Sequence, residues 1–211
     1  MSTNSVPNSL LRMRGTSFVV AGAGVGISVI VALVAKDSQL IFQAFLYAWI
    51  LSFGLAMGSQ GMLFMHHMTA GAWSFPIQRM LEASSRTIFV LGSIFLLGYV
   101  GTVAFGINHN YNVWIDSDNP IVQSKSWWLN LPFWTIRSVI YIVVAMGMAR
   151  LFSNWSKKLD DTGDALITLK FRKAAPVCLL VYCAIMTFAP LDWVMSLEPE
   201  WFSTIYGPLF A

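Results

Sequence analysis

The sequence predicts an all-α integral membrane protein, a polytopic transmembrane helix bundle with about five full spans and the start of a sixth. Of its 211 residues, 56% are hydrophobic and 11% are charged, whereas soluble domains carry about 25% charged residues. Its nine Trp and six Tyr residues stand mostly beside the apolar runs, where amphipathic rings favour the membrane interface. We therefore expect residues 1–211 to form one membrane region without a soluble domain.

Five apolar segments reach the length of about 20 residues that a helix needs to cross the bilayer core. In chain order they are Thr16 to Ala35, Gln39 to about His67, about Thr87 to Ile107, Leu131 to about Phe152, and Ala174 to about Leu197. The first is too long for the apolar core of a signal peptide, about 7 to 15 residues. A further apolar stretch, WFSTIYGPLFA, starts at Trp201 without completing a span. We expect the chain to be the N-terminal half of a longer protein.

The basic residues predict the orientation, because cytoplasmic loops carry an excess of lysine and arginine. Only Lys36 and Lys125 would lie on the outer side. The side of the N-terminus would hold Arg12, Arg14, Arg79, Arg86, Arg150, Lys157, Lys158, Lys170, Arg172 and Lys173. We therefore expect a cytoplasmic N-terminus, with His66 and His67 near the cytoplasmic face.

Polar side chains recur along the second predicted span. Ser52, Ser59 and His66 are spaced by seven residues, and Gln60 and His67 repeat that spacing on the neighbouring line. Seven residues are nearly two helical turns, so these groups would form a polar stripe about 21 Å long at about 1.5 Å per residue. The stripe is either a path for water and protons that ends in imidazoles, which titrate near neutral pH, or a set of hydrogen bonds between helices.

The fourth predicted span carries Arg137 about two turns from its outer end, with Tyr141 one turn deeper. Ionisable groups inside a membrane are costly and therefore mark candidate functional sites. Arg137 would either orient a carboxylate or a quinone-like carbonyl, or extend its charge to the outer interface. Arg137, Tyr141 and Trp193 are accordingly candidates for contact with a quinone or with neighbouring helices.

The fifth predicted span ends in TFAPLDWVMSLEPEW. Pro190 cannot donate to the carbonyl four residues back, so we expect the helix to kink or open there. Asp192 follows in the same turn, either as a group that handles a proton or ligand beside a freed carbonyl, or as an exposed acid at the helix end.

Two glycine pairs, Gly22 with Gly26 and Gly54 with Gly58, have the spacing that allows close helix approach, which predicts a tight bundle. Haem attachment by CxxCH, cysteine-ligated clusters, phosphate-binding loops and GxSxG hydrolases are all excluded by the absence of their motifs. Adjacent histidines point about 100° apart on a helix, so we predict no metal site. The charge of +3, without a basic and aromatic patch, also excludes nucleic acid as a partner.

Four longer strings carry a family resemblance: MLFMHHMTAGAWSFPIQRMLEASSRT, WWLNLPFWTIRSVIYIVV, NWSKKLDDTGD and FAPLDWVMSLEPEWFSTIYG. From about residue 40 onward the chain resembles the ActF-type membrane subunit of alternative complex III, the bacterial quinol:cytochrome c oxidoreductase. That family belongs to the polysulfide-reductase, or NrfD-like, superfamily.

The resemblance implies a ten-helix protein of about twice this length in the bacterial cytoplasmic membrane. It implies three partners: a homologous quinol-binding membrane subunit, an iron-sulfur subunit and c-type cytochrome subunits. Haem c and iron-sulfur clusters would then belong to the partners, and quinone or menaquinone would be the one cofactor left open for this chain. The quinol site itself is attributed to the sister subunit.

These observations lead to the hypothesis of a membrane subunit in a quinol-oxidising complex that contributes proton transfer in respiratory electron transport. The candidate proton-transfer residues are His66, His67, Ser52, Ser59, Gln60 and Asp192. The alternatives are a structural scaffold subunit without its own chemistry, and a secondary transporter, which a broken fifth helix would favour.

Overall fold

The computed structural model describes residues 15–20, 22–24, 27, 38–69, 75–104, 114–115 and 118–210. The chain divides into two compact units, Met1–Phe45 and Leu46–Ala211, and the second unit contains the helical bundle. The first predicted span, Thr16 to Ala35, lies largely outside the described residues, and its described part is helical at 15–20 and 22–24.

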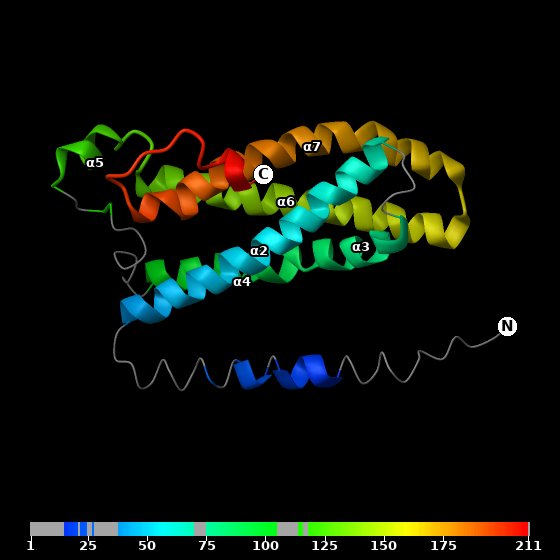
Figure 1. Ribbon diagram of the computed structural model, residues 1–211, viewed down its shortest axis with the longest axis horizontal. Helices are drawn as coiled ribbons and strands as arrows, with labels where there is room; N and C mark the ends of the chain where they lie inside the picture. The colour runs from blue at the N-terminus through cyan, green and yellow to red at the C-terminus, as the bar shows by residue number, and fades with distance from the viewer. Residues whose placement is uncertain are drawn as a thin grey trace. The chain divides into compact units, whose positions relative to one another are not determined.

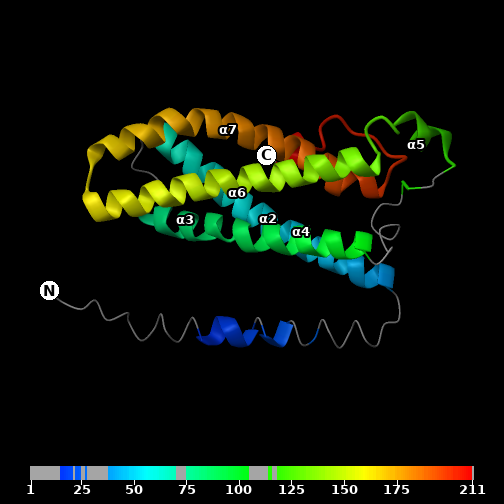
Figure 2. The same ribbon diagram turned by 180° about the vertical axis from the view of Figure 1, so that it is seen from behind.

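All secondary structure in the described residues is helical. The elements are α2 (Ser38–Thr69), η1 (Phe75–Ile77), α3 (Gln78–Arg86), α4 (Ile88–Ala104), α5 (Pro120–Ser124), α6 (Leu131–Thr162), α7 (Ala165–Trp193), η3 (Met195–Leu197) and η4 (Pro208–Phe210). Figures 1 and 2 show α6 and α7 side by side as a hairpin, α3 and α4 in succession along α6, and α2 crossing the bundle obliquely.

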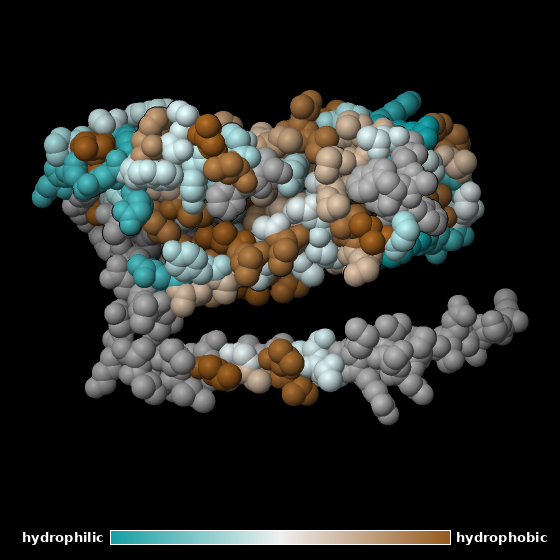
Figure 3. Space-filling model, in the orientation of Figure 1, coloured by the Kyte–Doolittle hydropathy of each residue, from teal (hydrophilic) through white to brown (hydrophobic). Residues whose placement is uncertain are grey.

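Four helical segments are long and apolar enough to cross a membrane: Gln43–Thr69, Gln78–Tyr99, Leu131–Thr162 and Ala165–Leu197. Their outward faces expose large apolar side chains, with Leu51, Leu97 and Leu180 each about 70% exposed. Hydrophobic surface lies over the middle of the bundle and hydrophilic surface gathers at its two ends (Figure 3). A multi-pass membrane protein is therefore indicated, with four spans in the described residues where the sequence predicted five and part of a sixth.

The hairpin of α6 and α7 extends beyond the predicted spans. Gly163 ends α6 with a positive φ of 62°, a conformation that glycine adopts without steric cost. Asp164 then caps α7, since its carboxylate accepts from the N–H of Leu166 at 2.9 Å. Hydropathy missed both ends because the last turns of α6 and the first turns of α7 carry charged residues. We call this end of the bundle the Gly163 end.

At the opposite end, Asn130 caps α6 by accepting from the N–H of Phe133 at 3.0 Å, and the last turn of α7 lies beside it. We call this the Trp128 end, after the residue that joins the two helices there. The third predicted span also starts earlier than expected. Its helical segment begins with α3 at Gln78 and continues into α4, with Thr87 between the two helices.

Oblique crossing lets α2 contact a different helix at each level. Near one end, the indole N–H of Trp49 donates to the carbonyl of Leu91 in α4 at 2.8 Å. Near the Gly163 end, His67 stacks on Phe171 of α7 with ring centroids 4.1 Å apart. Consequently α2 binds α4 and the α6–α7 hairpin together.

Close helix approach occurs at Gly61 and not at the predicted pair Gly54 and Gly58; Gly26 of the other predicted pair lies outside the described residues. A Cβ at Gly61 would lie 2.7 Å from the ring of Tyr182 in α7, whereas no described atom would lie within 4 Å of a Cβ at Gly54 or Gly58. The prediction that Gly54 and Gly58 seat a neighbouring helix is therefore not met within the described residues.

Where the sequence predicted the start of a sixth span, the chain is non-helical from Trp201 to Gly207 and folds back along α7 before η4. A side chain at Gly207 would overlap the carbonyl oxygen of Thr187, so only glycine allows this contact. The sequence pattern missed the return because it depends on a contact with α7.

Candidate functional site

An ion pair between Arg137 of α6 and Asp192 of α7 lies at the Trp128 end of the bundle. The Nε atom of Arg137 donates to Oδ2 of Asp192 at 2.8 Å, and Nη2 donates to Oδ1 at 2.6 Å. The Arg137 side chain is 9% exposed and Asp192 is 0% exposed. Two parallel charge-assisted bonds of this kind are strong and geometrically specific.

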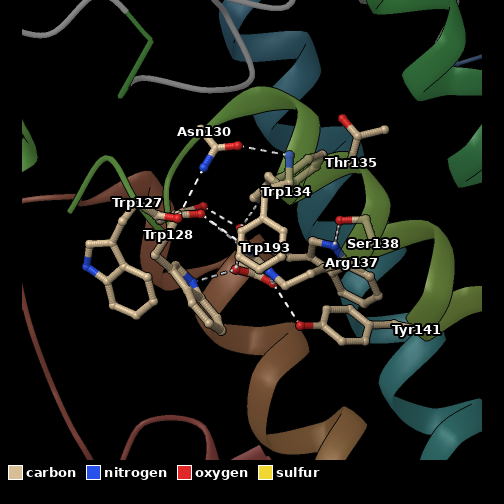
Figure 4. A network of polar contacts seen from close by, with 12 residues as sticks. Trp127, Trp128, Asn130, Trp134, Thr135, Arg137, Ser138, Tyr141 and Trp193 are labelled. Atoms are coloured by element: carbon tan, nitrogen blue, oxygen red, sulfur yellow. Dashed lines mark hydrogen bonds and ion pairs between the residues drawn. The ribbon is translucent and has the colours of Figure 1, made fainter.

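Two further donors complete the coordination of the carboxylate. Tyr141 donates its hydroxyl to Oδ2 at 2.9 Å, and Trp128 donates its indole N–H to Oδ1 at 3.0 Å. Both Nη atoms of Arg137 also donate to the carbonyl of Trp128 at 3.2 Å. We call these four residues the Arg137–Asp192 network, and Figure 4 shows the side chains of Trp128, Arg137 and Tyr141 converging.

The guanidinium group of Arg137 is also covered by aromatic rings. Its Cζ atom lies 4.0 Å from the ring centre of Trp128 and 4.2 Å from that of Phe133, which are distances of favourable cation–π contact. The alternative in which Arg137 extends to the outer interface is therefore wrong, because burial and pairing hold its charge inside. The alternative of an exposed Asp192 is wrong for the same reason.

Helix α7 continues through Pro190 to Trp193 and does not open there. The N–H of Val194 donates to the carbonyl of Pro190 at 3.0 Å. The carbonyl of Asp192 accepts from the indole of Trp134 at 2.8 Å and from the hydroxyl of Ser196. The carbonyls that the helix end would leave unpaired are thus satisfied from α6 and η3.

Trp193 lies in the core behind this network. It is 4% exposed, and its indole N–H donates to the hydroxyl of Ser138 at 2.9 Å. Its ring meets those of Trp49 and Tyr141 edge to face at 5.1 and 5.9 Å. The structure therefore places Trp193 and Tyr141 in contact between helices, with their polar atoms engaged by protein groups.

A second buried carboxylate, Glu82 of α3, lies toward the Gly163 end and is 5% exposed. Its Oε2 atom accepts from Ser156 of α6 at 2.8 Å and from Arg79 at 3.1 Å, and lies 4.0 Å from Arg86. Its Oε1 atom accepts from Gln78 at 3.2 Å. We call these five residues the Glu82 cluster, and it fastens α3 to α6.

The predicted polar stripe on α2 separates into two lines with different surroundings. Ser52 is exposed and donates to the carbonyl of Ala48 in its own helix. Ser59 donates both to Leu55 in its own helix and to the hydroxyl of Ser84 in α3 at 2.9 Å. The line of Ser52 and Ser59 therefore serves local and α2–α3 contacts.

The other line, Gln60 and His67, points into the bundle. Gln60 is 1% exposed, and its Nε2 atom donates to the carbonyl of Ala145 in α6 at 3.2 Å. Two buried atoms on this line, Gln60 Oε1 and His67 Nε2, have no hydrogen-bond partner among the described residues. We call this pair the Gln60–His67 line.

His66 lies beside this line, with its ring 5.0 Å from that of His67 at an interplanar angle of 66°. It is half-buried. The two adjacent rings thus lie at an angle to each other, and that of His67 stacks on Phe171. In the described part of the chain, no group of three or more His, Cys, Asp or Glu side chains is placed to hold a metal ion.

Sequence reasoning missed two members of these sites. Glu82 stands in a polar segment, and the spacing of Arg79, Glu82 and Arg86 on one helix face was the signal that could have identified it. Trp128 was assigned only to the membrane interface, and nothing local indicates that its indole reaches Asp192. Comparison with protein-family models and with curated proteins gave no match to this sequence.

Proposed function

We propose that this chain is a membrane subunit of a quinol:cytochrome c oxidoreductase of the alternative complex III type, and that it carries protons through the Gln60–His67 line. One observation supports the proton role: the two unpaired buried atoms, Gln60 Oε1 and His67 Nε2, lie on the same helix line. A buried polar atom without a partner costs about 1–3 kcal/mol, and buried waters usually satisfy such groups. Each atom therefore marks a site for water.

The spacing suits a short chain of waters. Gln60 and His67 are seven residues apart, or about 10 Å at about 1.5 Å per residue. Gln60 binds the carbonyl of Ala145, one turn along α6 from Tyr141, and Tyr141 donates to Asp192. The polar groups beyond Ala145 belong to the Arg137–Asp192 network, so the proposed chain of waters covers the Gln60–His67 line alone.

The chemistry of the proposed complex requires such a path. Oxidation of a quinol to a quinone releases two electrons and two protons. Metal centres of the partner subunits would take the electrons, and the protons need acceptors inside the membrane domain. An imidazole such as that of His67 has two ring nitrogens, so it can accept a proton on one and release a proton from the other, while Gln60 orders water without changing its own charge.

A scaffold role is favoured for the opposite end of the bundle. Asp192 accepts four hydrogen bonds, so both of its oxygens are already engaged and a proton would have to displace one of these bonds. This geometry supports a structural role for Asp192, whose hydrogen bonds hold α6 and α7 together. It does not support a role for Asp192 as a proton carrier. The secondary transporter is not favoured, because α7 is continuous through Pro190.

The assembled complex provides the test, with variants Gln60→Leu and His67→Phe against the control Ser52→Ala, which changes an exposed serine on the same helix. We expect both line variants to assemble with all subunits but to lose about a hundredfold or more in proton-coupled turnover, a typical contribution of a positioned proton-transfer group. Normal turnover and proton release in both variants would refute the proton role. Absence of iron-sulfur and cytochrome subunits from the purified complex would refute the assignment to this class.

A further inference from the structure

A cavity of about 220 Å³ lies beside the Arg137–Asp192 network, and its lining includes Trp128 of that network. Its walls come from three segments: the connection between α5 and α6, the end of α7 with η3, and the chain from Pro199 to Phe202. The apolar lining includes Trp127, Trp128, Leu191, Met195, Trp201 and Phe202. One water takes up about 30 Å³ of liquid, so the cavity has room for a larger apolar group.

The aromatic residues of this cavity differ from those of the core. Trp127, Trp201 and Phe202 are 72%, 49% and 67% exposed, whereas Trp134 is 0% exposed. Exposed tryptophans at the end of a spanning helix are typical of the membrane interface, where the ring meets both acyl chains and headgroups. The exposed rings around the cavity therefore favour a place at the membrane interface, and its apolar walls suit an acyl chain.

One charged group lines this cavity, and two more stand beside a lining residue in the sequence. The ammonium group of Lys125 lines it and donates to the carbonyl of Pro199 at 2.7 Å, which uses one of its three hydrogens. Pro199 also lines the cavity, and its two neighbours in sequence, Glu198 and Glu200, are both exposed. Glu200 accepts from the amide of Asn119 at 2.7 Å through one of its two carboxylate oxygens.

We propose that this cavity binds one phospholipid that carries a phosphate and a primary ammonium in its headgroup, the chemistry of phosphatidylethanolamine. An acyl chain occupies the apolar cavity, the phosphate meets the ammonium of Lys125, and the lipid ammonium meets the carboxylates of Glu198 and Glu200. A purely anionic headgroup would face those two carboxylates. A trimethylammonium headgroup has no N–H to donate to them, and free phosphate would leave the apolar walls unused.

The test uses the purified full chain in detergent, incubated with phosphatidylethanolamine, phosphatidylcholine or phosphatidylglycerol of identical acyl chains. Native mass spectrometry then measures the fraction of protein that carries one lipid. Lys125→Ala removes the phosphate contact, and Leu191→Trp fills the cavity. Their matched controls are Lys157→Ala, an exposed lysine at the Gly163 end, and Leu180→Trp, an exposed leucine on α7.

We expect phosphatidylethanolamine to bind about tenfold more tightly than the other two lipids, a difference of about 1.4 kcal/mol. Lys125→Ala should weaken binding about fivefold, since a lysine near lipid phosphate contributes about 1 kcal/mol. Leu191→Trp should abolish binding, and both controls should bind as the unaltered chain does. Trp127→Ala, which alters an exposed wall, should also weaken binding if Leu191→Trp fails to fold.

Three results would overturn the proposal. The first is equal retention of the three lipids, which would indicate an unspecific apolar surface. The second is unchanged binding by folded Leu191→Trp, or by Trp127→Ala where Leu191→Trp does not fold, which would place the lipid elsewhere. The third is displacement of the lipid by inorganic phosphate alone, which would indicate a phosphate site without a lipid requirement.

Discussion

The Arg137–Asp192 network and the Gln60–His67 line are both polar groups inside an apolar bundle, yet they differ in how their atoms are paired. In the network, the two carboxylate oxygens accept four hydrogen bonds and the guanidinium group is covered by Trp128 and Phe133. On the line, Gln60 Oε1 and His67 Nε2 have no partner among the described residues.

Paired and unpaired buried polar groups have different consequences for the bundle. A fully satisfied network holds one geometry, because any movement breaks several bonds at once. An unsatisfied pair in a dry core would be destabilising, so its presence is best explained by water that enters and exchanges. In the proposed function, the network therefore stabilises the bundle and the line carries the protons.

The variant Asp192→Ala should have the largest effect on stability. It leaves the charge of Arg137 buried and unpaired, which costs about 3–5 kcal/mol. Thermal unfolding of the full chain in lipid nanodiscs measures the loss, with Asp160→Ala as the control because Asp160 is an exposed acid of α6 that also pairs with an arginine. Similar losses of stability in both variants would show that the buried Asp192–Arg137 ion pair contributes no more than an exposed ion pair does.

The double variant Arg137→Met with Asp192→Leu should restore most of that stability, because apolar residues of similar volume often replace a buried ion pair at little cost. Proton release in the assembled complex should then stay near normal. Loss of proton release with restored stability would move the proton path to the network and contradict its structural role.

Glu82→Gln should have an intermediate effect of about 2 kcal/mol, the scale of a hydrogen bond to a charged group. The amide keeps the shape of the side chain but loses its charge toward Arg79 and Arg86. Chemical unfolding followed by circular dichroism provides the value, and Glu200→Gln is the exposed control. A larger loss of stability than for Asp192→Ala would show that the Glu82 cluster contributes more to the stability of the bundle than the Arg137–Asp192 network does.

Gly61→Ala should destabilise by about 1–2 kcal/mol, because its Cβ would meet the ring of Tyr182 and overpack the site. Gly54→Ala and Gly58→Ala should have little effect on the isolated chain, since no described atom would lie within 4 Å of the added Cβ at either position. Parallel thermal unfolding of the three variants tests this contrast. Equal losses would indicate that Gly54 and Gly58 also pack against a helix.

The sequence predicted the apolar centres of the described spans and several of their ends, such as Leu131 and Leu197, but not the charged turns at the Gly163 end. Hydropathy identifies Leu131 to Phe152, yet α6 continues to Thr162, because charged turns outside a bilayer are stabilised by helix pairing and by caps at Gly163 and Asp164. The sequence also predicted Arg137 and Asp192 separately as candidate site residues. Their pairing was missed because it joins residues 55 apart, a distance that no local pattern covers.

The polar stripe was predicted as one feature, since Ser52, Ser59 and His66 repeat with the same period as Gln60 and His67. The structure divides it because α2 crosses the bundle obliquely, so that one line meets α3 or the surface and the other meets α6 and α7. Periodicity defines the lines on a helix, but only the neighbouring helices decide which line is buried.

Gln60→Leu should have the smallest effect on stability, within about 1 kcal/mol, because an apolar side chain replaces one hydrogen bond and one unpaired acceptor at the same time. Thermal unfolding measures this against Ser52→Ala. A loss as large as that of Asp192→Ala would show that Gln60 is a structural residue and would remove the contrast between the two regions.

The most direct test asks whether water reaches His67. The chain has three histidines, so ¹⁵N-histidine labelling of the full chain in lipid bilayers gives few imidazole signals, and His66→Gln and His67→Gln variants assign them. Solid-state NMR then measures magnetisation transfer from water to Nε2 of His67. We predict clear transfer that decreases in Gln60→Leu and not in Ser52→Ala. Absence of transfer in the unaltered chain would contradict the claim that the Gln60–His67 line holds water and carries protons.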